Sequence, residues 1–330
     1  MDMRINMPDY FIGIDLGGTN IKMGIFDENV KLLNSISSPT NAQEGPDVII
    51  NRMAEMSRQI CAENDIEYAS LKAIGVGAPG PSNIAEGIVV AAPNLPKFRN
   101  VPIKQMIKDR TRKVCVFEND ANAACYGEYV VGAGRGADNM VFLTLGTGIG
   151  GGIITNGHII HGFMDNAAEL GHIIIEMDGR LCGCGQRGCV EAYASATSTV
   201  KRAVEALQAG RQSSLMEIYK QKGTVTAKDI YTESAKGDAL ALEITEGTAK
   251  ALGILCVSLL HVTGPRRILF AGGMIAAGDA LLGRIRHYYN KYLWPLKPEQ
   301  MEICFATLGE SAGMIGAAAL ACEFGNGSCL

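Results

Sequence analysis

The chain has 330 residues, 47% of them hydrophobic and 19% charged, which is typical of a globular protein with a sizeable core. At about 150 residues per domain, this length predicts about two domains. The formal net charge is −4 and no block of lysine and arginine exists, which argues against nucleic-acid and membrane partners. We find no signal-peptide pattern, and the longest apolar stretch, 251–262, is too short to span a bilayer. We therefore expect a cytoplasmic protein whose cysteines are reduced.

The first half of the chain predicts strands that end at glycine, proline or acidic residues. The predicted elements, in chain order, are strands at 10–15, 21–26 and 31–37, a helix over 46–61, strands at 73–78 and 113–117, and a helix over 120–130. The first three strands form a meander with a turn at 27–29. Asn119 or Asp120 is the expected N-cap of the last helix.

After a glycine-rich segment at 132–136 the pattern restarts. A strand at 140–145 leads into a glycine loop at 146–152 and a strand at 153–155, followed by an Asn-Gly turn. Asp15-Leu-Gly-Gly-Thr and Thr144-Leu-Gly-Thr-Gly are both strand ends that run through glycine into another strand, which indicates a weak internal repeat with one meander per domain. The remaining predicted elements are helices near 190–207, 238–261 and 278–292, a strand at 267–270, and a small-residue helix at 310–323 that packs back on the first domain.

The two glycine loops are candidates for phosphate binding, because glycine leaves backbone N–H groups uncovered and lets phosphate oxygens approach. The sequence has no G-x-x-x-x-G-K-[ST] motif, which excludes a P-loop. Gly146, Gly148 and Gly151 match G-x-G-x-x-G, but a hairpin rather than a helix follows, which disfavours dinucleotide binding. Tight hairpin turns are the plain alternative. Asp15 suits a hydrated Mg²⁺ that bridges phosphates, with an Asx turn as its alternative.

Three cysteines, Cys182, Cys184 and Cys189, fall within eight residues, and His172 stands ten residues before the first. Three thiolates and an imidazole are the ligand set of a tetrahedral structural zinc site. The alternatives are buried apolar cysteines and a redox or disulfide role. The other cysteines are scattered singly, as is typical of small buried hydrophobes; they are Cys61, Cys115, Cys125, Cys256, Cys304, Cys322 and Cys329.

Asp120 lies at a strand-to-helix junction, where a carboxylate can orient a hydroxyl and accept its proton during phosphoryl transfer. A helix cap is the structural alternative for this residue or its neighbour. Further acids and amides lie in loops bounded by Gly, Pro or Cys and form a candidate polyol-binding set; they are Asn94, Asn119, Asp120, Glu169, His172 and Glu191. Taken alone, Asn94 fits a turn residue equally well.

Four stretches together resemble the ROK family of repressors, open reading frames and kinases, and within it the bacterial glucokinases. They are 15–20, 118–124, 145–152, and 169–172 running into the cysteines at 182–191. The resemblance extends over roughly residues 10 to 320. It implies an α/β, two-domain, actin-like (ribonuclease-H-like) fold with the active site in the interdomain cleft. The domains expected from it are 1–118 with 311–330, and 119–310.

The same resemblance implies roles for individual residues. Asp120 would be the general base, and Asn94, Asn119, Asp120, Glu169, His172 and Glu191 would contact the sugar. Structural Zn²⁺ would be held by His172, Cys182, Cys184 and Cys189. ATP and its Mg²⁺ would be held by Asp15, Gly17, Gly18, Thr19, Asn20, Lys22, Gly146, Thr147, Gly148, Gly272 and Gly273.

The activity implied is ATP-dependent phosphorylation of the 6-hydroxyl of glucose, in a homodimer or homotetramer. Another substrate stays open: N-acetylmannosamine, N-acetylglucosamine, fructose or allose. A sugar-responsive transcriptional regulator is a further alternative from the same family. It is disfavoured because the first loop begins at Asp15, which leaves no room for a preceding DNA-binding motif.

Overall fold

The computed structural model describes residues 8–294 and 301–325. The described residues of 1–136, 159–167 and 308–330 pack into one unit, and those of 137–158 and 168–307 into a second. The first unit thus includes the helix at 120–130, which our expected boundary at 118/119 assigned to the other domain. The expected domain boundaries, 1–118 with 311–330 and 119–310, remain a prediction about which parts of the chain fold as separate domains.

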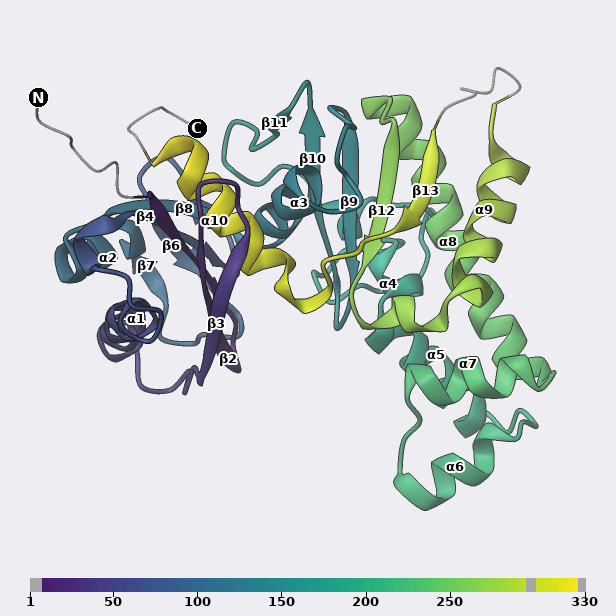
Figure 1. The fold of residues 1–330 in the computed structure, drawn as a ribbon. Helices are drawn as coiled ribbons and strands as arrows, with labels where there is room; N and C mark the ends of the chain where they lie inside the picture. Colours follow the sequence, from purple (N-terminus) through teal and green to yellow (C-terminus); the bar gives the residue numbers. More distant parts are fainter. Residues whose placement is uncertain (1–7, 295–300, 326–330) are drawn as a thin grey trace, which may run out of the picture. The chain divides into compact units, whose positions relative to one another are not determined.

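The first unit is built on a five-stranded sheet with the order β3-β2-β1-β4-β8 (Figure 1). Its strands are β1 (Tyr10–Leu16), β2 (Asn20–Phe26), β3 (Leu32–Pro39), β4 (Leu71–Ala78) and β8 (Val114–Asn119). β1, β2 and β3 pair with one another antiparallel in chain order, which confirms the predicted meander, while β4 is parallel to both β1 and β8. The carboxyl ends of β1, β4 and β8 therefore lie at one edge of this sheet.

Alternate side chains of β1 face two different layers. Ile12 and Ile14 are fully buried in a cluster that includes residues of α1 (Pro46–Ala62) and α2 (Ile103–Thr111). Phe11 faces the other way, in a cluster with Ala321 of α10 (Ala312–Phe324). A short 3₁₀ turn, η1 (Tyr68–Ser70), leads into β4. This period of two is the expected pattern of a strand covered on both faces.

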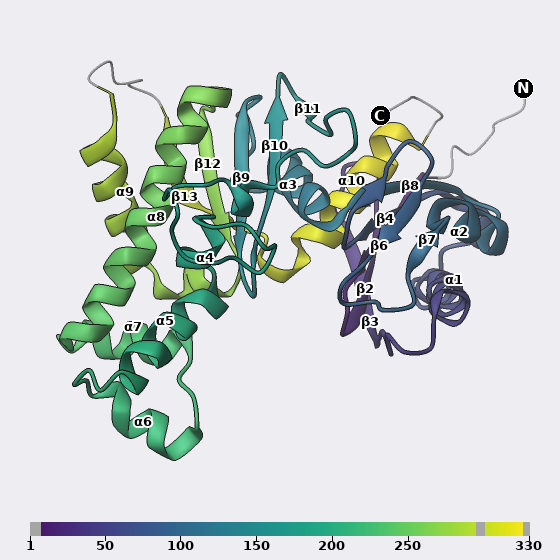
Figure 2. The ribbon, with the colours of Figure 1, turned by 180° about the vertical axis from the view of Figure 1, so that it is seen from behind.

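The C-terminal helix α10 lies directly against the first sheet and against α3 (Asp120–Val130), as Figures 1 and 2 show. A Cβ atom on Gly13 would come within 2.0 Å of the Met314 carbonyl, and one on Gly75 within 1.8 Å of the Ala317 carbonyl. Only glycine permits backbones to approach this closely. The predicted small-residue helix that returns to the first domain is confirmed; it begins after the 3₁₀ turn η4 (Gly309–Ser311).

A small three-stranded sheet in the first unit was not predicted. It consists of β5 (Ser82–Asn83), β6 (Ile88–Ala91) and β7 (Arg99–Val101), paired antiparallel in chain order. The strands are only two to four residues long, so they carry little periodic signal.

The second unit repeats the strand order of the first, as β11-β10-β9-β12-β13. Its strands are β9 (Met140–Leu145), β10 (Ile149–Thr155), β11 (His158–Ile159), β12 (Arg267–Ala271) and β13 (Glu302–Phe305). β9 and β10 are antiparallel, and β12 is parallel to β9 and β13. The predicted internal repeat is thus present as two sheets of one topology. The expected loop at 146–152 was too long, because β10 already begins at Ile149 and pairs its glycines with β9.

Helices make up the rest of the second unit. They are α4 (Glu191–Ala194), α5 (Ala196–Gln208), α6 (Leu215–Lys222), α7 (Ala227–Ala235), α8 (Ala239–Thr263) and α9 (Asp279–Tyr292), with the 3₁₀ turns η2 (Leu170–His172) and η3 (Gly273–Ala277). The helix expected over 190–207 is broken at Ser195, whose hydroxyl caps α5 by accepting from the Ser198 N–H at 3.1 Å. The helices near 238–261 and 278–292 are confirmed, whereas α6 and α7 were missed.

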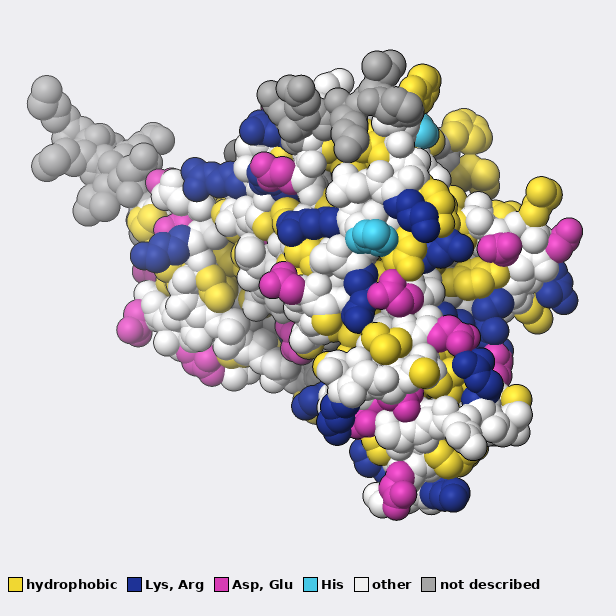
Figure 3. All heavy atoms as spheres, turned by 90° about the vertical axis from the view of Figure 1, so that its right-hand side faces the viewer, with side chains coloured by type: hydrophobic (Ala, Val, Ile, Leu, Met, Phe, Trp, Pro, Cys, Tyr) yellow, Lys and Arg dark blue, Asp and Glu magenta, His cyan; other side chains and the backbone are white. Residues whose placement is uncertain are grey.

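No helix in 8–294 or 301–325 is both long and apolar enough to cross a membrane. On the face of the molecule in Figure 3, basic and acidic side chains are intermixed. Of the single cysteines, four are buried and two half-buried, as expected of small apolar residues, and Cys329 lies outside the described residues.

Candidate active site

Strand β8 ends in Glu118 and Asn119, and α3 begins at Asp120. The Asn119 side chain accepts from the N–H groups of Ala121, at 2.9 Å, and Asn122, at 3.3 Å, so it is the N-cap. Asp120 is the first helical residue, and its Oδ1 accepts from the Ala121 N–H at 2.8 Å. Asn119 therefore caps the helix and fixes the backbone at Asp120, and Asp120 is not itself the N-cap.

Asp15 is the penultimate residue of β1, at the edge of the sheet where β8 leads into Asp120. Burial raises the pKa of Asp15 to about 6, the negative charge of Asp120 adds to this, and Lys22 opposes it. Two carboxylates that repel each other in a half-buried corner favour a bound cation. Carboxylate oxygens are ligands that Mg²⁺ prefers, so the donor set fits a magnesium ion accompanying a nucleotide.

The first glycine loop is closed by backbone hydrogen bonds. Gly17 N donates to Asn20 O at 3.0 Å, and Thr40 donates from its hydroxyl to Gly17 O at 2.6 Å and from its N–H to Thr19 O at 2.8 Å. Asn94 packs on this loop, since a Cβ on Gly18 would lie 2.6 Å from the Asn94 Cβ. The structure therefore brings Asn94 and the loop together within the first unit.

Lys22 was expected to contact the nucleotide. In the structure its ammonium pairs with the Glu310 carboxylate at 2.7 Å. Glu310 is 92% exposed, so this ion pair is weak. Lys22 can therefore leave Glu310 and bind a more highly charged anion such as a phosphate.

The second glycine loop is anchored to two helix starts. Gly146 O accepts from the Ala196 N–H at 2.9 Å, at the beginning of α5. Glu191, the first residue of α4, accepts from the Ile149 N–H at 2.8 Å. A Cβ on Gly148 would lie 2.5 Å from the same carboxylate oxygen, so a larger residue there would make the Glu191 side chain move. Glu191 and the loop are therefore adjacent, although Ile149 and Glu191 are 42 positions apart in the sequence.

The four predicted zinc ligands converge. One ligand atom each from His172, Cys182, Cys184 and Cys189 can be chosen so that all lie within 4.8 Å of one another. The Cys184 and Cys189 sulfurs are 3.7 Å apart, and Cys182 Sγ is 3.7 Å from His172 Nδ1. Tetrahedral Zn–S bonds of about 2.3 Å place sulfurs about 3.8 Å apart, so the spacing fits zinc.

The electrostatics of this cluster also fit a cation. Burial and the neighbouring thiols Cys184 and Cys182 raise the pKa of Cys189 to about 12, and burial raises the pKa of Cys182. A backbone hydrogen bond from Gln186 lowers the pKa of Cys184. Three thiolates are therefore unfavourable together unless a metal ion compensates their charge.

Glu169 precedes η2 and is exposed, and its carbonyl accepts from the His172 N–H at 3.0 Å. His172 faces Cys182 through Nδ1, which leaves Nε2 as the nitrogen that can reach a ligand. Glu191 Oε1 lies 3.6 Å from Cys182 Sγ. The cysteine cluster thus holds two of the predicted sugar-binding residues, Glu191 and His172, and Glu169 is fixed to it through the short turn.

A cavity of about 850 Å³ opens in the second unit beside the second glycine loop. It contains Gly146, Thr147 and Gly273 of the predicted nucleotide set, together with residues of α7 that were not predicted. The α7 residues are Ala227, Lys228, Tyr231, Thr232 and Ala235. The capping box of Thr226 and Asp229 marks the start of α7 in the sequence, but nothing local indicates that the helix lines a cavity. Gly272, with φ of +87°, makes the turn that places Gly273 there.

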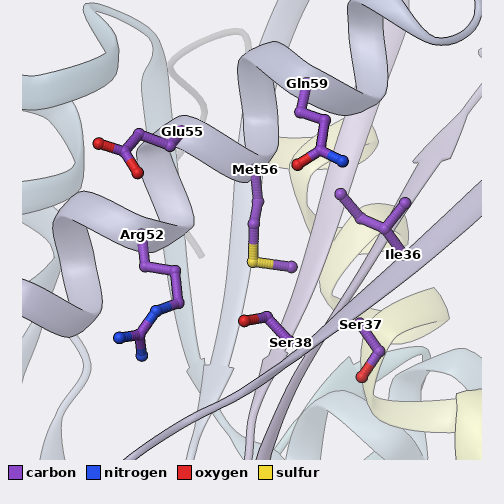
Figure 4. A pocket seen from close by; sticks show the side chains of 7 residues that line it. All are labelled: Ile36, Ser37, Ser38, Arg52, Glu55, Met56 and Gln59. Carbon is purple, nitrogen blue, oxygen red and sulfur yellow. The ribbon is translucent and has the colours of Figure 1, made fainter.

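A smaller hollow lies between β3 and α1 (Figure 4). Its guanidinium group, from Arg52, already donates to the carbonyls of Pro39 and Thr40 and pairs with Glu44. None of the predicted site residues lines it.

Residues 11–323 match the ROK family. The chain belongs to the ROK family. It is 37% identical to the glucokinase of Halalkalibacterium halodurans, covering 93% of this chain and 93% of the relative. It is also 37% identical to the glucokinase of Thermotoga maritima, covering 94% of this chain and 96% of the relative. A ROK family glucokinase from Streptomyces griseus, solved in complex with glucose and AMPPNP, superposes with a TM-score of 0.75 at 32% identity. That match covers 95% of this chain and 99% of the solved one.

These matches confirm the predicted fold class, the actin-like α/β fold of ROK sugar kinases. Within it, the first unit carries Asp15, the first loop, Asn94, Asn119 and Asp120. The second unit carries the second loop, Glu169, Glu191, the cysteine cluster and the cavity.

Proposed function

We propose that this ROK protein is an ATP-dependent sugar kinase that transfers the γ-phosphoryl group to the 6-hydroxyl of glucose. The observation that carries the proposal is its near-full-length similarity to glucokinases, in a chain that holds Asp120 at a capped helix start. The reaction needs a group that orients the hydroxyl and accepts its proton, and Asp120 has the chemistry for both.

Asp120 acts as a general base in this proposal. Its carboxylate accepts a hydrogen bond from the Ala121 N–H through Oδ1. A magnesium ion near Asp15 would supply charge stabilisation to the phosphate oxygens. The remaining sugar hydroxyls would be bound by carboxylate, amide and imidazole groups, from Asn94, Asn119, Glu169, His172 and Glu191.

The nucleotide would occupy the cavity beside the second loop. Its volume of about 850 Å³ lies within the usual range of small-molecule sites. Thr147 and Gly148 would direct backbone N–H groups at phosphates, while Gly146, whose N–H donates to Gly148 O at 3.0 Å, would shape the turn. Gly272 and Gly273 would lie near the adenosine. The residues of the first loop, Gly17, Gly18, Thr19, Asn20 and Lys22, would also bind phosphate oxygens.

We also propose that the cysteine cluster binds one structural Zn²⁺, which braces the sugar-binding side chains beside it. It performs no chemistry in this scheme. A homodimer or homotetramer working in the cytoplasm is the assembly and location that we propose.

A coupled assay of ADP release with a panel of sugars tests the proposed function. Glucose should give the highest kcat/KM among glucose, fructose, allose, N-acetylmannosamine and N-acetylglucosamine. A clear preference for another member would keep the reaction and change the substrate. Release of ADP that no sugar stimulates, together with a gel shift of upstream DNA, would overturn the proposal in favour of a regulator.

A further inference from the structure

Glu118 directly precedes the proposed sugar contact Asn119 and the proposed base Asp120, and it is only 1% exposed. Its Oε1 accepts from the Asn119 N–H at 2.8 Å and from the Asn122 side-chain amide at 3.0 Å. One carboxylate oxygen thus holds both sides of the turn that carries Asp120. Neither the general-base role nor the sugar contacts account for this buried acid.

The other oxygen of Glu118 is held by a histidine far along the chain. His161 Nε2 lies 2.7 Å from Glu118 Oε2, across 43 residues of sequence. A buried carboxylate is stabilised only when it is hydrogen-bonded and paired with a positive charge. His161, with a side chain 20% exposed, provides both when it is protonated.

The charge around His161 favours that protonated form. Burial alone would lower the pKa of His161, but the hydrogen bond and charge of Glu118, together with the charge of Asp165, raise it above its ordinary value. Glu118 and Asp165 are the charged groups that act on this imidazole. The pairing with Glu118 therefore favours the protonated imidazole more than it is favoured in a free histidine.

The segment that carries His161 is itself fixed to the first unit. Residues 159–167 pack with that unit, although the strands before them belong to the second sheet. Asp165 Oδ2 accepts from the Ile84 N–H at 2.7 Å, and the Ala167 N–H donates to His161 O at 2.9 Å. These two hydrogen bonds fix the turn that carries His161, and so they keep its imidazole next to Glu118.

We propose that His161 is a positioning residue for Asp120, acting through Glu118; this rests on the proposed function. The protonated imidazole fixes the Glu118 carboxylate, which fixes the Asn119 and Asn122 groups on either side of the base. Without His161, Glu118 keeps a buried charge with fewer partners, and the turn relaxes. A base displaced by a fraction of an ångström loses turnover before it loses sugar binding.

The experiment compares His161→Leu with His161→Gln, whose amide N–H can still donate to Glu118. His161→Leu should lower kcat by about 10- to 100-fold with the KM for sugar changed less than threefold. His161→Gln should recover at least part of that loss. It should also remove a fall in kcat that the wild type shows as pH rises through the raised pKa of His161. The control is His158→Gln, an exposed histidine three positions earlier in the sequence, which should leave kcat and its pH profile unchanged.

A double-mutant cycle separates this role from a general structural one. In a Glu118→Gln background, His161→Leu should cause little further loss of kcat, because its effect passes through that carboxylate. An equal loss in both backgrounds, or unchanged kcat in His161→Leu, would overturn the inference. NMR titration of His161 gives a readout that needs no kinase activity: its pKa should lie above about 6.5 and fall in Glu118→Gln. A pKa at or below that value contradicts the pairing, even if the proposed function fails on other grounds.

Discussion

The Glu191 carboxylate accepts a hydrogen bond from the Ile149 backbone N–H, with 2.8 Å between Oε2 and the nitrogen. Its other oxygen lies 3.6 Å from Cys182 Sγ. One side chain therefore joins the second glycine loop to the cysteine cluster. A substitution in the loop or in the cluster should therefore displace the Glu191 carboxylate, which is a proposed sugar contact.

Replacing Gly148 with Ala should displace Glu191, because the new Cβ would lie 2.5 Å from its Oε2. We expect the KM for sugar to rise by at least about tenfold, since a polar contact within the sugar site is lost. Steady-state kinetics with sugar and ATP varied separately measures this. Gly146→Ala is the matched control, as its Cβ meets nothing within 4 Å. It should raise the KM for ATP and leave the KM for sugar alone; a normal sugar KM in Gly148→Ala would contradict the link.

Removing one zinc ligand should weaken metal binding, stability and sugar affinity together. In Cys184→Ser the sulfur that lies 3.7 Å from Cys189 Sγ is lost, and a hydroxyl is a poor zinc ligand. Metal analysis should fall from about one zinc per chain to well below one, with a lower Tm and a raised Kd for sugar. Cys322→Ser, whose thiol donates to the Glu28 carbonyl in the first unit, should change none of these. If Cys184→Ser loses its zinc but keeps the wild-type Kd for sugar, the metal does not position the sugar-binding side chains.

The sequence predicted best those elements whose signal is local. The strands at 10–15 and 140–145 and the helix at 120–130 carry apolar runs or a cap, and the structure places them within a residue of the prediction. The start of β10 was missed because Gly150, Gly151 and Gly152 have little preference for strands. Their extended form comes from the ladder with β9, which is a tertiary contact.

The same division applies to the candidate site. The cysteine cluster was visible because its four ligands lie within 18 residues of sequence. The pairing of His161 with Glu118 and the lining of the cavity by Lys228 and Tyr231 were not visible. The pairing depends on the tertiary contact between β8 and the 159–167 segment, and the cavity lining depends on where α7 packs. Hydrophobic periodicity predicts neither of these contacts.

Asp15→Asn should stabilise the free protein and weaken nucleotide binding. Burial and Asp120 raise the pKa of Asp15 from 3.8 to about 6, so between these values the folded protein holds a proton that the unfolded chain releases. The protonated Asp15 therefore costs the folded state nothing below pH 3.8. As the pH rises through about 6, Asp15 must ionise inside the protein, and the free energy of unfolding falls. At pH 7, without ligand, Asp15→Asn should melt a few degrees above the wild type, and the difference should vanish near pH 4.

The same variant should raise the KM for Mg-ATP by at least about tenfold, because an amide is a weaker magnesium ligand than a carboxylate. Thermal melts across pH and kinetics at varied Mg-ATP measure the two effects. Asp9→Asn, at an exposed ion pair with Lys72 at 3.1 Å, is the control and should show neither. An Asp15→Asn protein that is less stable at pH 7 would contradict the assigned burial cost.

Asp120→Asn should abolish most turnover while the fold and the sugar affinity remain. Asn119 caps α3, and an asparagine at 120 keeps an oxygen that can accept from the Ala121 N–H, so the helix start is preserved. An amide cannot accept the hydroxyl proton, and kcat should fall by about 10²- to 10⁴-fold. Calorimetry should give a Kd for glucose within a few-fold of wild type, and Asp109→Asn, on the exposed face of α2, should retain full turnover. Near-normal kcat in Asp120→Asn would show that another group accepts the proton, and the half-buried Asp15 would then be the next carboxylate to replace.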